Sequence, residues 1–157
     1  MKMGGSKLVV NDNLAKEKAA ESNCSRRQVG ALIVKHNSVL ISAANGTPNG
    51  CTPCNQGGCS RCQSATLSGE AYDSCICIHA EQRAIEMAAS NGITVQGTTM
   101  YVTLQPCIPC LNLCLHAGIL DVVYGEEIAF NAFVEKAYAQ FIKATSIYLR
   151  RLSILAP

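Results

Sequence analysis

His79-Ala80-Glu81 and Pro106-Cys107-Ile108-Pro109-Cys110 are the two stretches that decide the fold. Together they offer one imidazole, two thiolates and a carboxylate that is not needed as a metal ligand. Structural zinc is normally closed by four protein ligands, whereas catalytic zinc keeps three and leaves the fourth position for water. The sequence therefore predicts a catalytic zinc ion held by His79, Cys107 and Cys110.

Glu81 stands two residues after the predicted ligand His79. Bound zinc lowers the pKa of its water toward neutrality, and a nearby carboxylate can carry protons between that water and a leaving group. Glu81 is thus the predicted catalytic acid and base. A redox-active Cys-x-x-Cys after a strand is another interpretation of Cys107 and Cys110, but it leaves His79 and Glu81 unexplained.

Strand-like and helical segments alternate on both sides of these motifs. β-Branched apolar runs indicate strands, and apolar residues at helical spacing indicate helices. The pattern predicts helices over residues 11–22, 79–90 and 127–143 and one starting at Pro106, and strands over 29–34, 39–44, 98–104, 119–124 and, less clearly, 146–152. Right-handed crossovers between such segments give a three-layer α/β/α sandwich. We expect residues 1–157 to form a single domain.

Residues 50–77 form a cysteine-rich insertion that is too polar and too broken by Gly and Pro to build its own core. A loop of this length is functional or is held by something else. Without a signal peptide, metal is a better explanation for the cysteines than disulfides. Seven thiols exceed the four that close one tetrahedral zinc, so either some are free or two ions bind. They are Cys24, Cys51, Cys54, Cys59, Cys62, Cys75 and Cys77.

Composition excludes several classes of protein. The formal net charge is only +2, with neither a basic run nor aromatic residues interleaved with one, so polynucleotide binding is not expected. The sequence shows no apolar stretch long enough to span a membrane, so we expect a cytoplasmic protein with no membrane partner. Charged residues make up only 15% of the chain and hydrophobic residues 48%, which favours burial of surface in a homo-oligomer.

Four segments resemble the deoxycytidylate (dCMP) deaminase branch of the cytidine deaminase superfamily, in which H-x-E…P-C-x-x-C is the zinc signature. They occur in the order of that family, at residues 28–34, 45–50, 79–85 and 100–107. The resemblance implies a cytidine deaminase-like fold with a mixed sheet of about five strands. It also implies zinc-dependent hydrolysis of dCMP to dUMP and ammonia, which supplies thymidylate synthesis, and a hexameric homo-oligomer.

The resemblance also implies roles for residues outside the zinc motif. Asn45 is expected to contact the sugar of a nucleotide substrate, and Ala80 belongs to the same predicted substrate site. Arg26 and Arg27 are candidates for the 5′-phosphate, since a guanidinium matches phosphate bidentately. The candidate ligands of a second, structural zinc are Cys24, Cys54 and Cys77, as in some dCMP deaminases, and Cys59, Cys62 and Cys75, as in a bacterial subgroup.

Other functions fit the same motif. The substrate could be another cytosine nucleoside or nucleotide, such as cytidine or dCTP, or a different amino-heterocycle. From another class of protein, the chain could be a zinc-held binding module without activity. The intact Glu81 argues against the binding module, because a structural zinc ion does not require that carboxylate.

Overall fold

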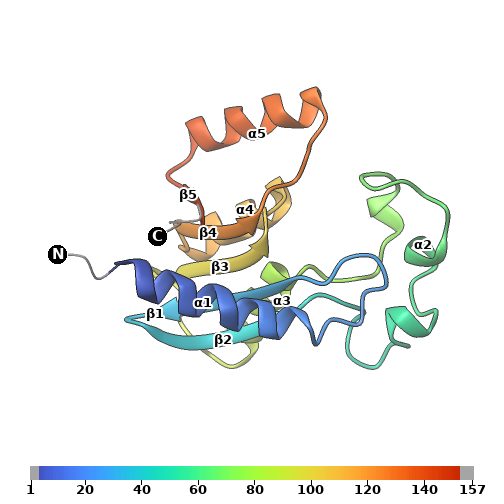
Figure 1. Cartoon of the computed structure of the whole chain (residues 1–157), viewed down its shortest axis with the longest axis horizontal. Coiled ribbons are helices and arrows are strands. Elements are labelled where there is room, and N and C mark those ends of the chain that lie inside the picture. The colour runs from blue at the N-terminus through green and yellow to red at the C-terminus, as the bar shows by residue number, and fades with distance from the viewer. Residues whose placement is uncertain (1–3, 153–157) are drawn as a thin grey trace.

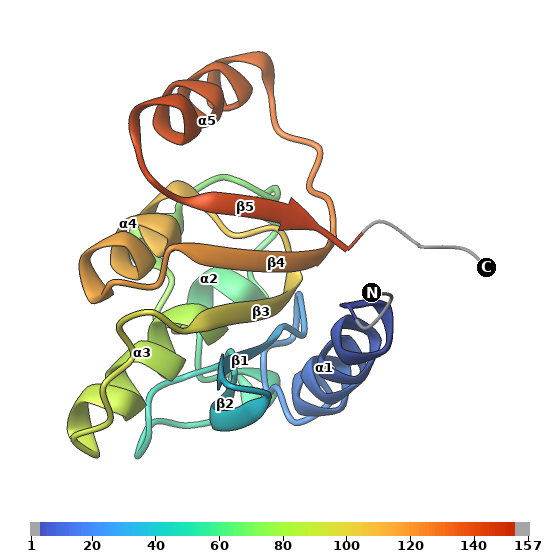
Figure 2. The same ribbon diagram turned by 90° about the vertical axis from the view of Figure 1, so that its left-hand side faces the viewer.

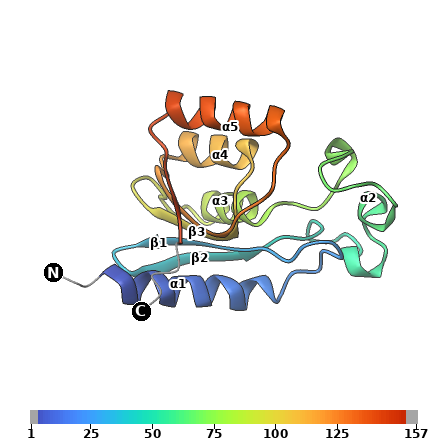
Figure 3. The same cartoon turned by 45° about the horizontal axis from the view of Figure 1, so that its top comes forward.

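The computed structural model describes residues 4–152. The helices in this span are α1 (Gly4–Ala19), α2 (Ser60–Gln63), α3 (Ala80–Ser90), α4 (Ile108–Ala117) and α5 (Ala132–Ala144), with short 3-10 turns η1 (Cys54–Gln56) and η2 (Tyr72–Ser74). The strands are β1 (Gly30–Lys35), β2 (Ser38–Ala44), β3 (Thr99–Leu104), β4 (Asp121–Glu126) and β5 (Tyr148–Arg151). Figure 1 shows that α1 covers one face of the sheet, and Figure 3 shows α3, α4 and α5 on the other. The predicted three-layer α/β/α sandwich is confirmed.

The sheet is mixed, with strand order β2-β1-β3-β4-β5. β1 pairs antiparallel with β2 and β3, whereas β3, β4 and β5 run parallel. The hairpin between β1 and β2 turns at His36 and Asn37, which both have positive φ angles, as expected of a tight hairpin turn. The uncertain segment 146–152 contains β5, so the five-stranded mixed sheet is also confirmed.

The two faces of the sheet bury different apolar sets. Toward α3 and α4 the sheet presents Met100 and Val122, which are fully buried with Leu111 of α4. Toward α1 it presents a smaller buried set, which includes Leu32 and Val123. Three alanines spaced by four residues form the inner face of α3, at positions 80, 84 and 88. Because alanine is short, α3 lies close to the sheet, and its N-terminus is placed firmly at one sheet edge.

Three helix starts differ from the sequence prediction. α1 begins at Gly4, well before the predicted residue 11. Asp12 lies inside this helix, where it pairs with Lys16 one turn later, and so it does not cap the helix. α5 begins at Ala132 and not at residue 127, because the side chain of Asn131 accepts a hydrogen bond from the backbone N–H of Val134. That contact is an N-cap, and it excludes the preceding residues from the helix.

The helix after β3 starts at Ile108, two residues later than predicted. Cys107 is its extended N-cap residue, and Pro109 occupies the first turn. The prediction used Pro106 for that position, on the ground that the missing N–H of proline costs nothing in a first turn. The same reasoning holds for Pro109, which is the proline in the first turn of α4. As a result the ligand Cys107 lies just outside α4 and Cys110 lies within its first turn.

The insertion leaves the sheet after β2 and returns at α3 (Figure 1). It contains only η1, α2 and η2, each of three or four residues. Figures 1 and 3 show this region projecting from one end of the sheet, and Figure 2 shows β5 beyond β4. Across residues 4–152, none of the helices has the length and apolar character needed to cross a membrane.

Candidate zinc and substrate site

The ends of α3 and α4 bring His79, Cys107 and Cys110 together. His79 is the N-cap residue of α3 and Cys107 that of α4, so both sit where a helix begins. The Nδ1 atom of His79 lies 3.5 Å from the Cys107 sulfur and 3.4 Å from the Cys110 sulfur. Tetrahedral zinc with bonds of about 2.0 Å to nitrogen and about 2.3 Å to sulfur places such atoms about 3.6 Å apart. The three residues therefore fit zinc in both donor type and spacing.

The electrostatics of the three side chains also suit a cation. Hydrogen bonds from Cys110 and His79 lower the pKa of the Cys107 thiol to about 4, so it is a thiolate at neutral pH. The hydrogen bond to Cys107 in turn raises the pKa of His79. The neighbouring Cys107 and burial both raise the pKa of Cys110. Two thiols this close share one proton, and a bound metal ion would remove it.

Glu81 lies in the first turn of α3 and is 4% exposed. Burial raises the pKa of its carboxyl group to about 7. His79 is exposed, Cys107 is half-buried and Cys110 is buried. The site is thus open to solvent on the His79 side and closed behind the carboxylate. A carboxyl group with a pKa near neutrality can both accept and give up a proton during a reaction.

Asn45 is held by contacts within the chain. Its Oδ1 accepts hydrogen bonds from the Ser22 hydroxyl at 2.6 Å and from the Val29 backbone N–H at 2.8 Å. Its Nδ2 donates to the carbonyl oxygen of Arg27 at 2.8 Å. One N–H of the amide is left for a ligand. The strand-end capping role is therefore what the structure shows for Asn45, and its contact with a sugar stays a prediction.

The loop that carries Asn45 is joined directly to the zinc helix. Gly46 and Ile78 exchange two backbone hydrogen bonds, of 3.2 and 2.8 Å, immediately before His79. Arg83 of α3 donates to the carbonyl oxygens of Ala44, Gly46 and Thr47. Sequence reasoning did not single out Arg83. Its position four residues after a ligand, on the same side of α3, is the signal that could have identified it.

Tyr138 is a second residue that sequence reasoning missed. Its hydroxyl donates to the carbonyl oxygen of Pro106 at 2.9 Å, and its ring packs against Phe130. The side chain of Gln105 accepts a hydrogen bond from the N–H of Ile128. These contacts connect α5 and the loop before it to the segment that leads into Cys107.

The two candidate phosphate ligands have different surroundings. Arg26 donates hydrogen bonds to four backbone carbonyl oxygens of the insertion. Four of its five guanidinium N–H groups are thus committed to the backbone, and its role as a phosphate ligand stays a prediction. Arg27 is exposed and makes one side-chain hydrogen bond, to the hydroxyl of Ser68. Ala80 has a fully buried side chain, so only its backbone could meet a substrate.

Arg27 also lines a cavity of about 630 Å³. The wall of the cavity includes the cation Lys16 and the carboxylates Glu126 and Glu127. The cavity reaches Leu104, three residues before Cys107, but the three predicted zinc ligands and Glu81 do not line it. The cavity therefore does not contain the candidate zinc site.

The candidate structural ligands gather in the insertion. The structure places the sulfur atoms of Cys24, Cys54, Cys62 and Cys77 within 4.8 Å of one another, and does the same for Cys59, Cys62, Cys75 and Cys77. Cys51 is exposed and belongs to neither group. Cys114 is fully buried in α4, where burial raises the pKa of its thiol to about 12, as expected of an apolar core residue.

Comparison with known proteins agrees with this geometry. The chain is 36% identical over 133 residues to the deoxycytidylate deaminase of Schizosaccharomyces pombe, an alignment that covers 85% of this chain and 40% of the relative. It is 36% identical over 119 residues to the deoxycytidylate deaminase of Mycobacterium phage D29, covering 73% of this chain and 90% of the relative. The chain thus spans less than half the length of the S. pombe protein.

Among solved structures, the fold is similar to that of dCMP deaminase from the cyanophage S-TIM5 in complex with dCMP and dUMP. The TM-score is 0.69 at 26% sequence identity, over 92% of this chain and 95% of the phage protein. Residues 9–126 match the family described as the cytidine and deoxycytidylate deaminase zinc-binding region. That span includes the three predicted zinc ligands and Glu81. The chain therefore belongs to the cytidine and deoxycytidylate deaminase zinc-binding family.

Proposed function

We propose that this protein catalyses the hydrolytic deamination of dCMP to dUMP and ammonia. The observation that carries the proposal is the buried Glu81 beside a three-ligand set of zinc type, His79, Cys107 and Cys110. A structural site would use four ligands and would have no need for a buried carboxylate. The naming of the relatives as deoxycytidylate deaminases supports dCMP as the substrate.

When bound, zinc would lower the pKa of a water molecule to near neutrality and so supply the nucleophile. Glu81 accepts a proton from that water and gives it to N3 of the cytosine ring as the oxygen adds to C4. Glu81 then carries the remaining proton of the attacking water, now on the oxygen bound to C4, to the amino group. The C4–N bond breaks and the amino group leaves as ammonia. A carboxyl group with a pKa of about 7 suits both transfers.

The surroundings of the site suggest how the nucleotide is held. We assign the 5′-phosphate to Arg27, because it is exposed and lines a cavity together with the cation Lys16. Asn45 has one amide N–H left and holds the backbone of Arg27. The N–H of Ala80 lies in the first turn of α3, where N–H groups have no intrahelical acceptor. These contacts would place a base near Glu81 and a phosphate near Arg27.

The test is ammonia release from dCMP, deoxycytidine, cytidine and dCTP, measured in parallel with zinc content. We expect dCMP to be turned over best. Arg27→Ala should raise the KM for dCMP and leave the KM for deoxycytidine unchanged, since only the former carries a phosphate. Turnover of unphosphorylated substrates alone would refute the role of Arg27. If a zinc-loaded protein releases ammonia from none of the four compounds, the binding module is favoured.

The cysteines of the insertion are proposed to hold zinc with a structural role, in addition to the catalytic ion. Assembly into a homo-oligomer, hexameric by family resemblance, is a further part of the proposal. Large apolar side chains on different elements are exposed and could be covered by subunit contacts, for example Val10, Phe133 and Tyr148. Sedimentation equilibrium of the purified protein tests the assembly. A monomer at micromolar concentration would refute it.

A further inference from the structure

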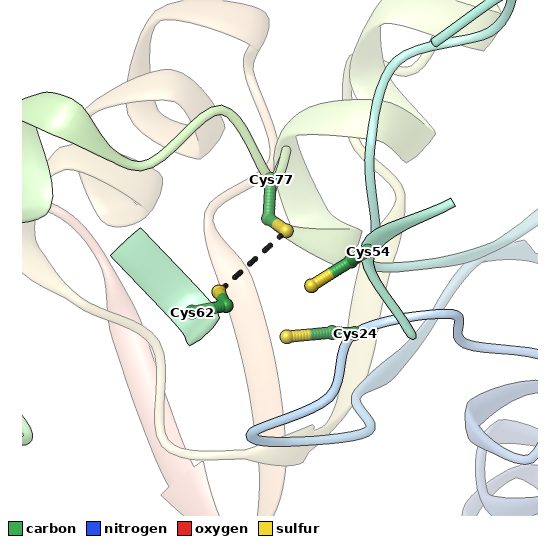
Figure 4. Close-up of side chains that lie close together, drawn as sticks. All are labelled: Cys24, Cys54, Cys62 and Cys77. Carbon is green, nitrogen blue, oxygen red and sulfur yellow. Dashed lines mark hydrogen bonds between the residues drawn. The ribbon is translucent and has the colours of Figure 1, made fainter. Parts of the chain in front are cut away.

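The two groups of four cysteines at the insertion have members in common. Both contain Cys62 and Cys77, so six cysteines make up two complete sets of four. Figure 4 shows the first set, in which Cys24, Cys54, Cys62 and Cys77 come from different segments and direct their sulfur atoms toward a common point. The second set replaces Cys24 and Cys54 with Cys59 and Cys75.

The distances fit two metal tetrahedra that share an edge. A tetrahedron with metal–sulfur bonds of about 2.3 Å has sulfur–sulfur edges of about 3.8 Å. The shared pair, Cys62 and Cys77, is 3.9 Å apart. In the second set, Cys75 lies 3.8 Å from Cys59 and 3.9 Å from Cys62. These separations are much longer than the roughly 2.05 Å of a disulfide.

Cysteines also supply the apolar packing of the insertion. The buried cluster at its centre consists of cysteines, four of them buried and two packed against these. Its helical elements have three or four residues each, which is too short to be stable alone. A segment of this kind is typically ordered by bound metal, because the free energy of binding becomes free energy of folding.

Charges and donors around the sulfur atoms favour an anionic cluster. Two divalent ions and six thiolates would leave two negative charges. The guanidinium of Arg26 donates hydrogen bonds to the carbonyl oxygens of Cys62 and of residues close to it in sequence. Arg61 lies between two of the ligands in sequence, is buried, and donates to the carbonyl oxygens of Leu67 and Glu70. Both cations contact the backbone of the insertion that carries the sulfur atoms, and the N–H of Ser25 donates to the Cys54 sulfur at 3.4 Å.

We propose that the insertion holds a two-zinc cluster in which Cys62 and Cys77 bridge the ions, Cys24 and Cys54 complete one site, and Cys59 and Cys75 complete the other. Cys77 stands two residues before His79, and the residue between them pairs with Gly46. The cluster thus fixes the start of α3 and the loop of Asn45. It deepens the structural-zinc part of the proposed function and does not depend on the reaction.

The first test is the number of zinc ions per chain in protein purified under reducing conditions, by elemental analysis and native mass spectrometry. We expect three, two in the cluster and one in the catalytic site. Cys59→Ser should remove one ion, because the set of Cys24, Cys54, Cys62 and Cys77 stays complete. Cys51→Ser is the matched control, since Cys51 lies in the same insertion outside both sets, and it should keep all three.

A total of two ions in the wild type, unchanged in Cys59→Ser, would overturn the cluster in favour of a single structural zinc. Cys77→Ser, which could unfold the insertion, is not needed for this decision. Exchange with cadmium-113 gives a second measurement on the folded wild type. Sulfur atoms that bridge the two ions predict two cadmium NMR resonances, each split by coupling to the other. X-ray absorption spectroscopy should then give a metal–metal distance of about 3 Å. Two resonances without coupling would overturn the bridging.

The count also separates this inference from the reaction. Cys107→Ser should lose the catalytic ion and keep two. A protein with three ions but no deaminase activity would support the cluster while refuting the proposed function. A protein with deaminase activity but only two ions would support the proposed function while refuting the cluster.

Discussion

Arg26 donates from Nε to the carbonyl oxygen of Cys62 at 3.1 Å, and so links the segment after Cys24 to the α2 turn of the insertion. The remaining guanidinium nitrogens donate to the carbonyl oxygens of Arg61, Ser64 and Thr66. A planar guanidinium can satisfy several carbonyls at once because its donors are fixed in a fork. Arg26 is therefore a clamp on the cysteine-rich insertion.

Arg26→Lys should loosen the insertion, because a single ammonium group cannot reach four carbonyl oxygens. Hydrogen bonds from charged groups contribute about 1.5 to 3 kcal/mol each when buried, and this one is partly exposed, so we expect a loss of about 2 kcal/mol in the free energy of unfolding. Urea unfolding and zinc release to a chromogenic chelator measure the effect. Arg27→Lys is the control. If Arg26→Lys and Arg27→Lys unfold and release zinc alike, Arg26 does not hold the insertion in this way.

Glu81→Gln should keep the catalytic zinc while losing turnover. The amide has a similar shape but cannot carry protons, and general acid–base catalysis typically contributes about 10² to 10⁴ in rate. The kcat for dCMP and the zinc content should be measured on the same samples. Glu86→Gln changes an exposed carboxylate of the same helix and should behave as wild type. Near-normal turnover in Glu81→Gln would remove Glu81 from the mechanism.

Arg83→Met should reduce activity without removing a group that touches substrate. Arg83 holds the carbonyl oxygens on both sides of Asn45, so its loss should let that loop move relative to His79. We expect kcat/KM for dCMP to fall by at least about tenfold, equivalent to about 1.4 kcal/mol, mostly through a rise in KM. Arg83→Lys should restore part of the loss. A fall in thermal stability with unchanged KM would show a purely structural role.

Tyr138→Phe removes the hydrogen bond to the carbonyl oxygen of Pro106 and keeps the packing of the ring on Phe130. The carbonyl is then left without this donor at a buried site, which should cost about 1 to 3 kcal/mol of unfolding free energy. Chemical unfolding curves provide the measurement, with Tyr148→Phe on the exposed side of β5 as the control. If both variants unfold at the same denaturant concentration, α5 does not support the Cys107 segment through this bond.

Removal of zinc by a chelator should expose the insertion to trypsin while the sheet stays folded. Arg61 is 7% exposed in the structure, and its guanidinium is hydrogen-bonded within the insertion. Without metal we expect cleavage after Arg61 within minutes, because local opening there no longer breaks metal–sulfur bonds. Mass spectrometry of timed digests identifies the site. Resistance of Arg61 in the metal-free protein would mean that the insertion is ordered without metal.

Local patterns in the sequence were sufficient for the architecture. The β-branched runs and the helical spacing predicted each strand and the major helices, since a segment's own periodicity determines which face it can bury. The exceptions were helix starts. There the deciding contact was a single capping side chain, as at Asn131, or a proline that fits the first turn equally well at either of two positions.

By itself, the sequence determined the chemistry of the zinc site, because residue type and spacing specify which ligands a metal can have. Only the tertiary structure decided how the remaining residues are used. It brought Cys24 to the insertion, made Cys62 and Cys77 common to two sulfur groups, and turned Arg26 toward backbone carbonyls. These contacts join segments far apart in the chain, and no local periodicity encodes which side chains meet across such a distance.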